Sequence, residues 1–351
     1  MLSFHSLVPN VDAFIVHKSI LYYGVGNKIY SNFTNSTIFE YNFTNLKNRI
    51  SGFISWNDFL VFFDAYGTKR LGFKNGQILP FEFHITRVLD DQYCLIENRD
   101  KGTMELINYE QNIVWERNFI SYVISYCDKT ELLFFIKKGE NDVYQIKAID
   151  KKTGSDAWTS DFPDCHYIGF SGHKNGRLYL NIIKDTTKPS LTYILECNSG
   201  KILDIIDRES LGAPRINYQV QYDRSLNRLV SHLYELDLDN HEVHVREYFR
   251  ETENRRKKPV VSNTAVWNDR YYLDIFRKES DAYRKIVNPY EFLVFDRIND
   301  TVVDSIILEG NKDLLSIGIK KLELHHDKLY AHDCLNNLRI YDFSEFADAQ
   351  S

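Results

Sequence analysis

A short aromatic and aliphatic run that follows a turn recurs eight times along this chain of 351 residues. When one apolar position in each run is taken as equivalent, successive copies lie 34 to 58 residues apart, with a mean of 44. The eight positions are Leu21, Leu60, Cys94, Leu133, Leu178, Leu229, Tyr271 and Leu329. Regular spacing of this length indicates that one supersecondary unit is used many times along the chain.

Each copy carries the signals of four short strands. A strand, a turn and another strand follow the apolar run, as in residues 145–162, and an alternating run precedes it, as in residues 49–56. The hairpin turns contain glycine, which adopts a positive φ at little cost, as in Asn75-Gly76, Thr153-Gly154 and Ser199-Gly200. No segment longer than ten residues has convincing helical spacing. The pattern predicts an all-β protein, a β-propeller of eight four-stranded blades, or of seven if the region 226–326 is divided wrongly.

The two ends of the chain complement each other. The last repeat, from residue 320 onward, supplies only three strands, and Met1 to Val8 lies before the inner strand of the first repeat. We therefore expect the N-terminal segment to complete the last blade, which closes the ring and removes its open edges. Residues 1–351 are then a single β-propeller domain.

Residues 148–158 carry the clearest copy of the repeat, AIDKKTGSDAW. This stretch resembles the quinoprotein-like (PQQ-like) β-propeller repeat, with matches at Ala148, Asp150, Thr153, Gly154 and Trp158. Trp115, in NYEQNIVW, ends a more degenerate copy. The resemblance implies that the tryptophan docks between blades and that the Thr-Gly turn links the two outer strands.

The resemblance also bears on activity. The dehydrogenases of this family carry a vicinal cysteine pair beside the quinone, whereas no two of the five cysteines here are adjacent. We therefore expect a non-catalytic member of the family that binds no cofactor. The sequence contains no GxSxG elbow, Walker loop or HExxH motif, so no catalytic residue is assigned.

Composition limits the cellular setting and the partners. The net charge of −6 argues against nucleic acid as a partner. Scattered, odd-numbered cysteines fit a reducing compartment, and neither a signal peptide nor a long apolar segment is present. We expect a cytoplasmic, bacterial protein that does not enter a membrane.

Two histidine clusters are weighed as metal sites, and neither is assigned. His241 and His244 lie three residues apart, which on a strand directs them to opposite faces. The stretch ELHHDKLYAHD is richer, with His325, His326, Asp327, His332 and Asp333, but polar turns have the same composition. A charged run, residues 250–259, is expected to be an exposed connection that could contact an acidic partner.

Propellers usually bind their partners where the inner strands begin. The residues predicted to line this rim are Arg49, Arg87, Tyr122, His166, Arg215 and Lys320. Arginine and tyrosine are enriched at binding hot spots, so we predict a scaffold that binds another protein through one rim, with an immunity or antitoxin-like inhibitor as one form of that role. The alternative is a propeller that binds or hydrolyses a carbohydrate or another small molecule at the mouth of its central channel.

Overall fold

The computed structural model contains strands and turns, and no helix within the residues that it describes. These residues are 2–32, 36–40, 49–64, 70–74, 77–80, 83–98, 100–118, 123–127, 130–139, 143–187, 190–213, 221–231, 234–245, 257–259, 266–278, 290–308, 319–326 and 328–343. Within them, no segment forms a helix able to cross a membrane. The chain divides into a central unit, Phe83–Arg246, and a terminal unit made of Met1–Glu82 and Glu247–Ser351.

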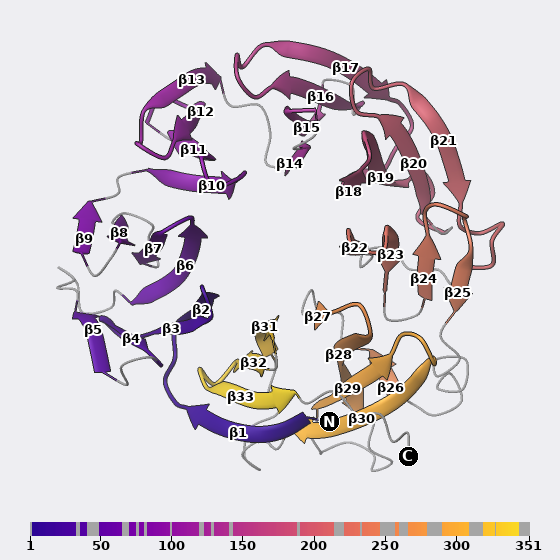
Figure 1. Ribbon diagram of the computed structural model, residues 1–351. Coiled ribbons are helices and arrows are strands. Elements are labelled where there is room, and N and C mark those ends of the chain that lie inside the picture. The colour runs from indigo at the N-terminus through magenta and orange to yellow at the C-terminus, as the bar shows by residue number, and fades with distance from the viewer. Residues whose placement is uncertain are drawn as a thin grey trace. The chain divides into compact units, whose positions relative to one another are not determined.

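Each sheet of the central unit is an antiparallel meander whose four strands follow one another in chain order (Figure 1). We name each sheet by its first and last strands. Sheet β10–β13 contains β10 (His84–Val88), β11 (Tyr93–Asn98), β12 (Thr103–Asn108) and β13 (Ile113–Asn118). Sheet β14–β17 contains β14 (Val123–Cys127), β15 (Leu132–Lys138), β16 (Tyr144–Asp150) and β17 (Asp156–Phe162). Sheet β18–β21 contains β18 (Tyr167–Lys174), β19 (Arg177–Ile183), β20 (Leu191–Glu196) and β21 (Ile202–Asp207). Sheet β22–β25 contains β22 (Gln221–Asp223), β23 (Arg228–Val230), β24 (Tyr234–Asp237) and β25 (Val243–Val245).

The terminal unit also contains four sheets. Sheet β2–β5 contains β2 (Ala13–His17), β3 (Ile20–Val25), β4 (Lys28–Ser31) and β5 (Ser36–Glu40). Sheet β6–β9 contains β6 (Ile50–Trp56), β7 (Phe59–Asp64), β8 (Arg70–Lys74) and β9 (Gln77–Pro80). Sheet β26–β30 contains β26 (Lys257–Pro259), β27 (Val266–Trp267), β28 (Tyr271–Lys278), β29 (Tyr290–Asp296) and β30 (Thr301–Leu308). The last sheet contains β31 (Ile319–His325), β32 (Lys328–Asp333), β33 (Leu338–Phe343) and β1 (Leu2–Val8).

The last sheet confirms the predicted pairing of the two chain ends. Strand β1 runs antiparallel to β33, with Leu2 opposite Phe343 and Val8 opposite Leu338. A segment from the start of the chain thus supplies the fourth strand of a sheet whose other three come from its end. The pairing covers what would otherwise be the open edge of β33.

Seven sheets have the four strands predicted for a blade, and sheet β26–β30 has five. Eight sheets are thus present in the described residues, and the expectation of four strands in every one is corrected for sheet β26–β30 alone. The departure lies in the region 226–326, where the sequence left the count open. Both β26 and β27 pair with β28, at Phe276–Lys278 and at Tyr272–Leu273, so two short strands share one edge of β28. The predicted exposed connection at 250–259 is wrong for Lys257–Pro259, which is strand β26, and the rest of that run lies outside the described residues.

The eight repeat positions all lie on the strand that follows the inner strand of each sheet, and each is at most 1% exposed. Strand β15 illustrates why these positions are buried, because its residues Leu132 through Ile136 are all buried and both of its faces are therefore covered. A strand whose two faces both contact neighbouring sheets must carry an apolar run instead of an alternation. The outer strand β17 instead alternates between more and less exposed positions.

Neighbouring sheets in the central unit pack face to face. One core cluster joins Phe134 and Ile146 of sheet β14–β17 to Leu178 and Leu180 of the next sheet. Another joins Leu106 of sheet β10–β13 to the following sheet. Successive small meanders that bury their faces against each other are the blades of a β-propeller, and this is the fold class of the chain.

Candidate functional site

The terminal unit brings together two of the predicted rim residues, Arg49 and Lys320. Arg49 directly precedes β6, and its Nη1 lies 3.4 Å from Oδ1 of Asp12, in the connection between β1 and β2. Lys320, on β31, donates a hydrogen bond from Nζ to the side chain of Asn336. The carbonyl of Asn336 accepts a hydrogen bond from the Val11 amide at 2.6 Å. We call Asp12, Arg49, Lys320 and Asn336 the rim cluster.

The charges of the rim cluster are not balanced. Asp12 is its one carboxylate, and its Oδ2 also accepts the amide of Gly26 at 2.7 Å. The side chain of Arg49 is 64% exposed, whereas that of Asp12 is 11% exposed. The cluster therefore contains two cations and one partly buried anion, which suits an acidic partner surface.

His332 lies beneath the rim cluster. It is buried, and its Nε2 lies 2.7 Å from the carbonyl of Val11, to which a neutral imidazole donates. Burial lowers the pKa of His332, and the charge of Lys320 lowers it further, although the bond to Val11 acts in the opposite direction. His332 is therefore a structural support for the backbone that carries Asp12.

The other predicted rim residues lie elsewhere or are not described. Arg87 is an exposed residue of β10, and His166 directly precedes β18. The amide of His166 donates to the carbonyl of Ile183 at 2.8 Å, and its carbonyl accepts from Tyr144. Tyr122 and Arg215 lie outside the described residues.

The tryptophan motif joins successive sheets of the central unit, as the repeat implied. Trp158 donates from Nε1 to the carbonyl of Cys197, at the start of the β20–β21 turn, at 2.8 Å. A Cβ built on Gly200 of that turn would lie 2.6 Å from the Trp158 ring. Trp115 repeats the arrangement one sheet earlier, with a 2.7 Å bond to the carbonyl of Lys151 and its ring against Gly154. Each tryptophan thus rests on the glycine turn of the following sheet.

The remaining motif residues shape the turn that receives Trp115. Oδ1 of Asp150 accepts the amide of Thr153 at 2.8 Å and its hydroxyl at 3.0 Å, which lowers the pKa of Asp150. Gly154 has a φ of 70°, which glycine adopts without strain. Ala148 is fully buried opposite Trp158. The turn links β16 to β17, the two outer strands, as predicted.

One sheet further along, a contact between a histidine and an aspartate takes the place of the tryptophan contact. Asp204 on β21 occupies the position that is equivalent to Trp158 on β17. Each is paired with a residue of the preceding strand, Ile194 or Ala148, immediately before the pairing of the two strands shifts by one residue. His241 stands in the next turn with a φ of 62°, and its Nε2 lies 3.6 Å from Oδ2 of Asp204. His241 therefore lies in a turn and not on a strand, which corrects the reason given for excluding a shared metal site with His244. Sequence reasoning missed this pair because neither residue resembles the motif.

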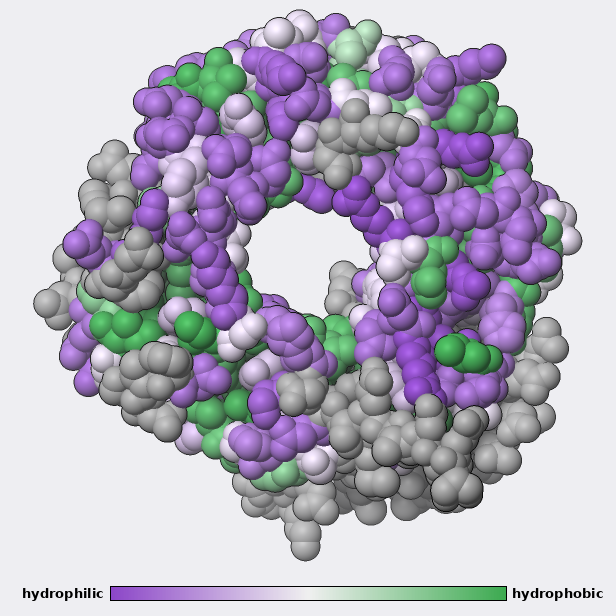
Figure 2. Space-filling model, in the orientation of Figure 1, coloured by the Kyte–Doolittle hydropathy of each residue, from purple (hydrophilic) through white to green (hydrophobic). Residues whose placement is uncertain are grey.

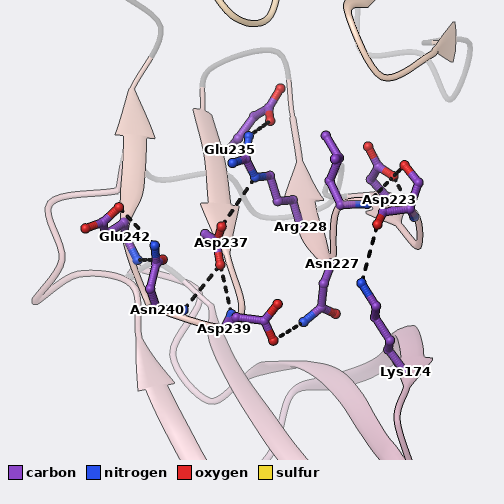
Figure 3. A network of polar contacts seen from close by, with 11 residues as sticks. Lys174, Asp223, Asn227, Arg228, Glu235, Asp237, Asp239, Asn240 and Glu242 are labelled. Atoms are coloured by element: carbon purple, nitrogen blue, oxygen red, sulfur yellow. Dashed lines mark hydrogen bonds and ion pairs between the residues drawn. The ribbon is translucent and has the colours of Figure 1, made fainter.

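Sheet β22–β25 carries a dense polar network (Figure 3). Nη1 of Arg228 lies 3.4 Å from Oε2 of Glu235, and its Nε lies 3.5 Å from Oδ2 of Asp237. Oδ1 of Asp237 accepts a hydrogen bond from the amide of Asp239 at 2.9 Å. Asn227 donates to Asp239 at 2.7 Å. These carboxylates cap turns and pair with a cation, so the network holds the sheet together.

The described residues contain no group of three or more side chains able to hold a metal ion. In the histidine-rich stretch, the rings of His325 and His326 stack at 4.2 Å, and Asp327 lies outside the described residues. Asp333 is fully buried and accepts the amides of Leu335 and Asn337. His332 and Asp333 are therefore engaged with the backbone.

No protein-family model and no curated protein matches the chain. Among solved structures, BamB from Moraxella catarrhalis has 10% identity, with 98% of this chain and 100% of that one covered, at a TM-score of 0.49. The computationally designed protein Ika8 has 9% identity, with 97% and 98% covered, at a TM-score of 0.58. At this level of identity, the likeness to Ika8 concerns the fold alone.

Proposed function

We propose that this chain is a non-catalytic β-propeller scaffold that binds an acidic surface of another protein through the rim cluster. The supporting observation is that Arg49 pairs with the Asp12 carboxylate, while Lys320 bonds to Asn336, whose carbonyl accepts the amide of Val11, the residue before Asp12. A rigid sheet scaffold that presents cations at its edge favours electrostatic selection of a partner. Arg87, His166, Tyr122 and Arg215 remain proposed contacts of the same kind.

Inhibition by occlusion is the form of this role that we favour, as in an immunity protein or antitoxin. A rigid surface with a fixed charge pattern can cover the active site of a toxic enzyme without chemistry of its own. The motif at residues 148–158 supports placement among PQQ-like propellers. All five cysteines are free thiols, which supports a reducing, cytoplasmic setting.

The test is a charge reversal at the rim cluster. The double variant Arg49→Glu/Lys320→Glu is compared with the wild type and with Lys201→Glu, an exposed residue of the β20–β21 turn. Partners are captured from a lysate of the native host, identified by mass spectrometry, purified and titrated against all three proteins. We expect a partner whose affinity falls at least about 100-fold in the double variant and stays unchanged in Lys201→Glu, because each close charge pair contributes on the order of 1.5 kcal/mol or more.

Two results would contradict the proposal. One is a purified partner that binds the double variant as tightly as the wild type. The other is the failure of repeated captures, with and without cross-linking, to return any partner that binds the purified chain.

A further inference from the structure

A polar cleft opens in the central unit between sheets β10–β13 and β14–β17. Its volume is about 650 Å³, within the range of sites that hold small molecules. The walls come from β12 and β13 on one side and from β15, β16 and β17 on the other. Hydrophilic side chains cover most of the coloured surface on the face shown in Figure 2. The residues that line the cleft are Thr103, Glu116, Arg117, Asn118, Lys137, Gln145, Lys147 and Thr159.

Arg117 lines the cleft and is held there by two hydrogen bonds. One of its terminal nitrogens, Nη1, donates to the carbonyl of Gly154 at 2.5 Å and to Oδ1 of Asp156 at 2.6 Å. Its Nε and Nη2 groups have no partner among the residues that the structure describes. The guanidinium is therefore anchored along one side and offers three N–H groups on the other. A planar fork of this kind matches the two oxygens of a carboxylate or phosphate.

Two lysines add to the positive charge. Lys147 lies 2.6 Å from Oδ2 of Asp156, so Asp156 is shared between Arg117 and Lys147. Burial raises the pKa of Asp156, but the bonds from Lys147 and Arg117 outweigh it and the net shift is downward. Lys137 lines the cleft, is exposed, and makes no hydrogen bond or ion pair within the described part of the chain.

The cleft has little negative charge of its own. Its one acidic lining residue is Glu116, which Lys101 already engages at 3.1 Å. Three of the lining residues, Arg117, Lys137 and Lys147, are cations. The carboxylates of Asp156, Asp161 and Glu105 do not line the cleft but bond to residues that do. The Asn118 amide and the Thr159 hydroxyl also line the cleft and supply neutral donors.

We infer that this cleft binds a small oxyanion, a molecule that carries a phosphate or carboxylate group, with Arg117 and Lys137 as its principal contacts. Donors that the fold already holds at the cleft cost little to organise, and Lys137 has no carboxylate partner within the described part of the chain. The site is independent of the rim cluster, because the two lie in different units of the chain.

Titration of the whole chain with inorganic phosphate and, separately, with citrate tests the inference. Ionic strength is held constant with sodium chloride, and binding is followed by calorimetry and by the rise in melting temperature. The variants are Lys137→Gln in the cleft and Lys201→Gln, an exposed lysine of the same unit that does not line it. We expect saturable binding of at least one anion, weakened roughly 5- to 10-fold by Lys137→Gln and unchanged by Lys201→Gln.

The two anions distinguish the sources of the ligand. Tighter binding of phosphate indicates a phosphorylated ligand, and tighter binding of citrate indicates a carboxylate ligand. The inference is overturned if neither anion binds saturably, or if Lys137→Gln leaves binding unchanged or weakens it no more than Lys201→Gln does. Circular dichroism of both variants excludes loss of fold as the cause of weaker binding.

Discussion

Substitution of Gly154 by alanine tests whether the tryptophan contact locks neighbouring sheets together. A Cβ on Gly154 would lie 2.7 Å from Cγ and 2.9 Å from Cδ2 of Trp115, closer than packed atoms allow. The chain offers a matched control in Gly176, whose φ of 76° is close to the 70° of Gly154. A Cβ on Gly176 would meet nothing within 4 Å.

Both variants lose stability through the strained backbone of an alanine with positive φ, and only Gly154→Ala also loses stability through steric overlap with Trp115. An alanine with positive φ costs roughly 1 kcal/mol at either position. Overlap with the buried ring of Trp115 adds about 1 to 3 kcal/mol, the range for overpacked cores. We therefore expect Gly154→Ala to lose about 2 to 4 kcal/mol of unfolding free energy and Gly176→Ala about 1 kcal/mol.

Urea denaturation followed by far-ultraviolet circular dichroism measures both losses. A double-mutant cycle with Trp115→Ala then isolates the contact, since removal of the ring should reduce the penalty of Gly154→Ala to that of Gly176→Ala. The reasoning is refuted if the two glycine variants lose equal stability in the wild-type background. It is equally refuted if the extra loss persists without the Trp115 ring.

Two further predictions concern buried polar groups. Arg208 is 1% exposed and donates hydrogen bonds to the side chains of Ser190, Thr192, Asn181 and Tyr234. In urea denaturation, Arg208→Leu should lower the unfolding free energy by about 3 kcal/mol, and Arg208→Lys, which lacks the planar guanidinium, by most of that amount. A loss below about 1 kcal/mol in Arg208→Leu would contradict this prediction. Burial keeps the pKa of His332 below its ordinary value of 6.5. Since the unfolded chain takes up a proton there below pH 6.5 and the folded chain does not, stability should fall as pH drops through 6.5, by up to about 1 kcal/mol per pH unit from this group. His332→Gln should lose less stability between pH 7 and pH 5.5, and an equal loss in both proteins would argue against the assignment.

The repeat was predictable because it depends on local pattern alone. An apolar run at positions such as Leu133 and Leu178 can be sheltered from water only if both faces of its strand are covered, and both residues are fully buried. Glycine at positions 154 and 200 follows from turn geometry, which a few consecutive residues decide. Pairing of the chain ends followed from counting strands.

The polar sites were less accessible to sequence reasoning. Arg49 and Lys320 are predicted as separate rim residues, whereas Asp12, the carboxylate that pairs with Arg49, gives no signal in the sequence. The cleft at Arg117 and the pair of Asp204 with His241 gave no signal, because each joins side chains from two different, successive sheets rather than from one local run of sequence. Secondary structure depends on neighbours along the chain, so the sequence by itself determined the blades. Charges act through space, so only the packing of one sheet against the next decided which of them meet.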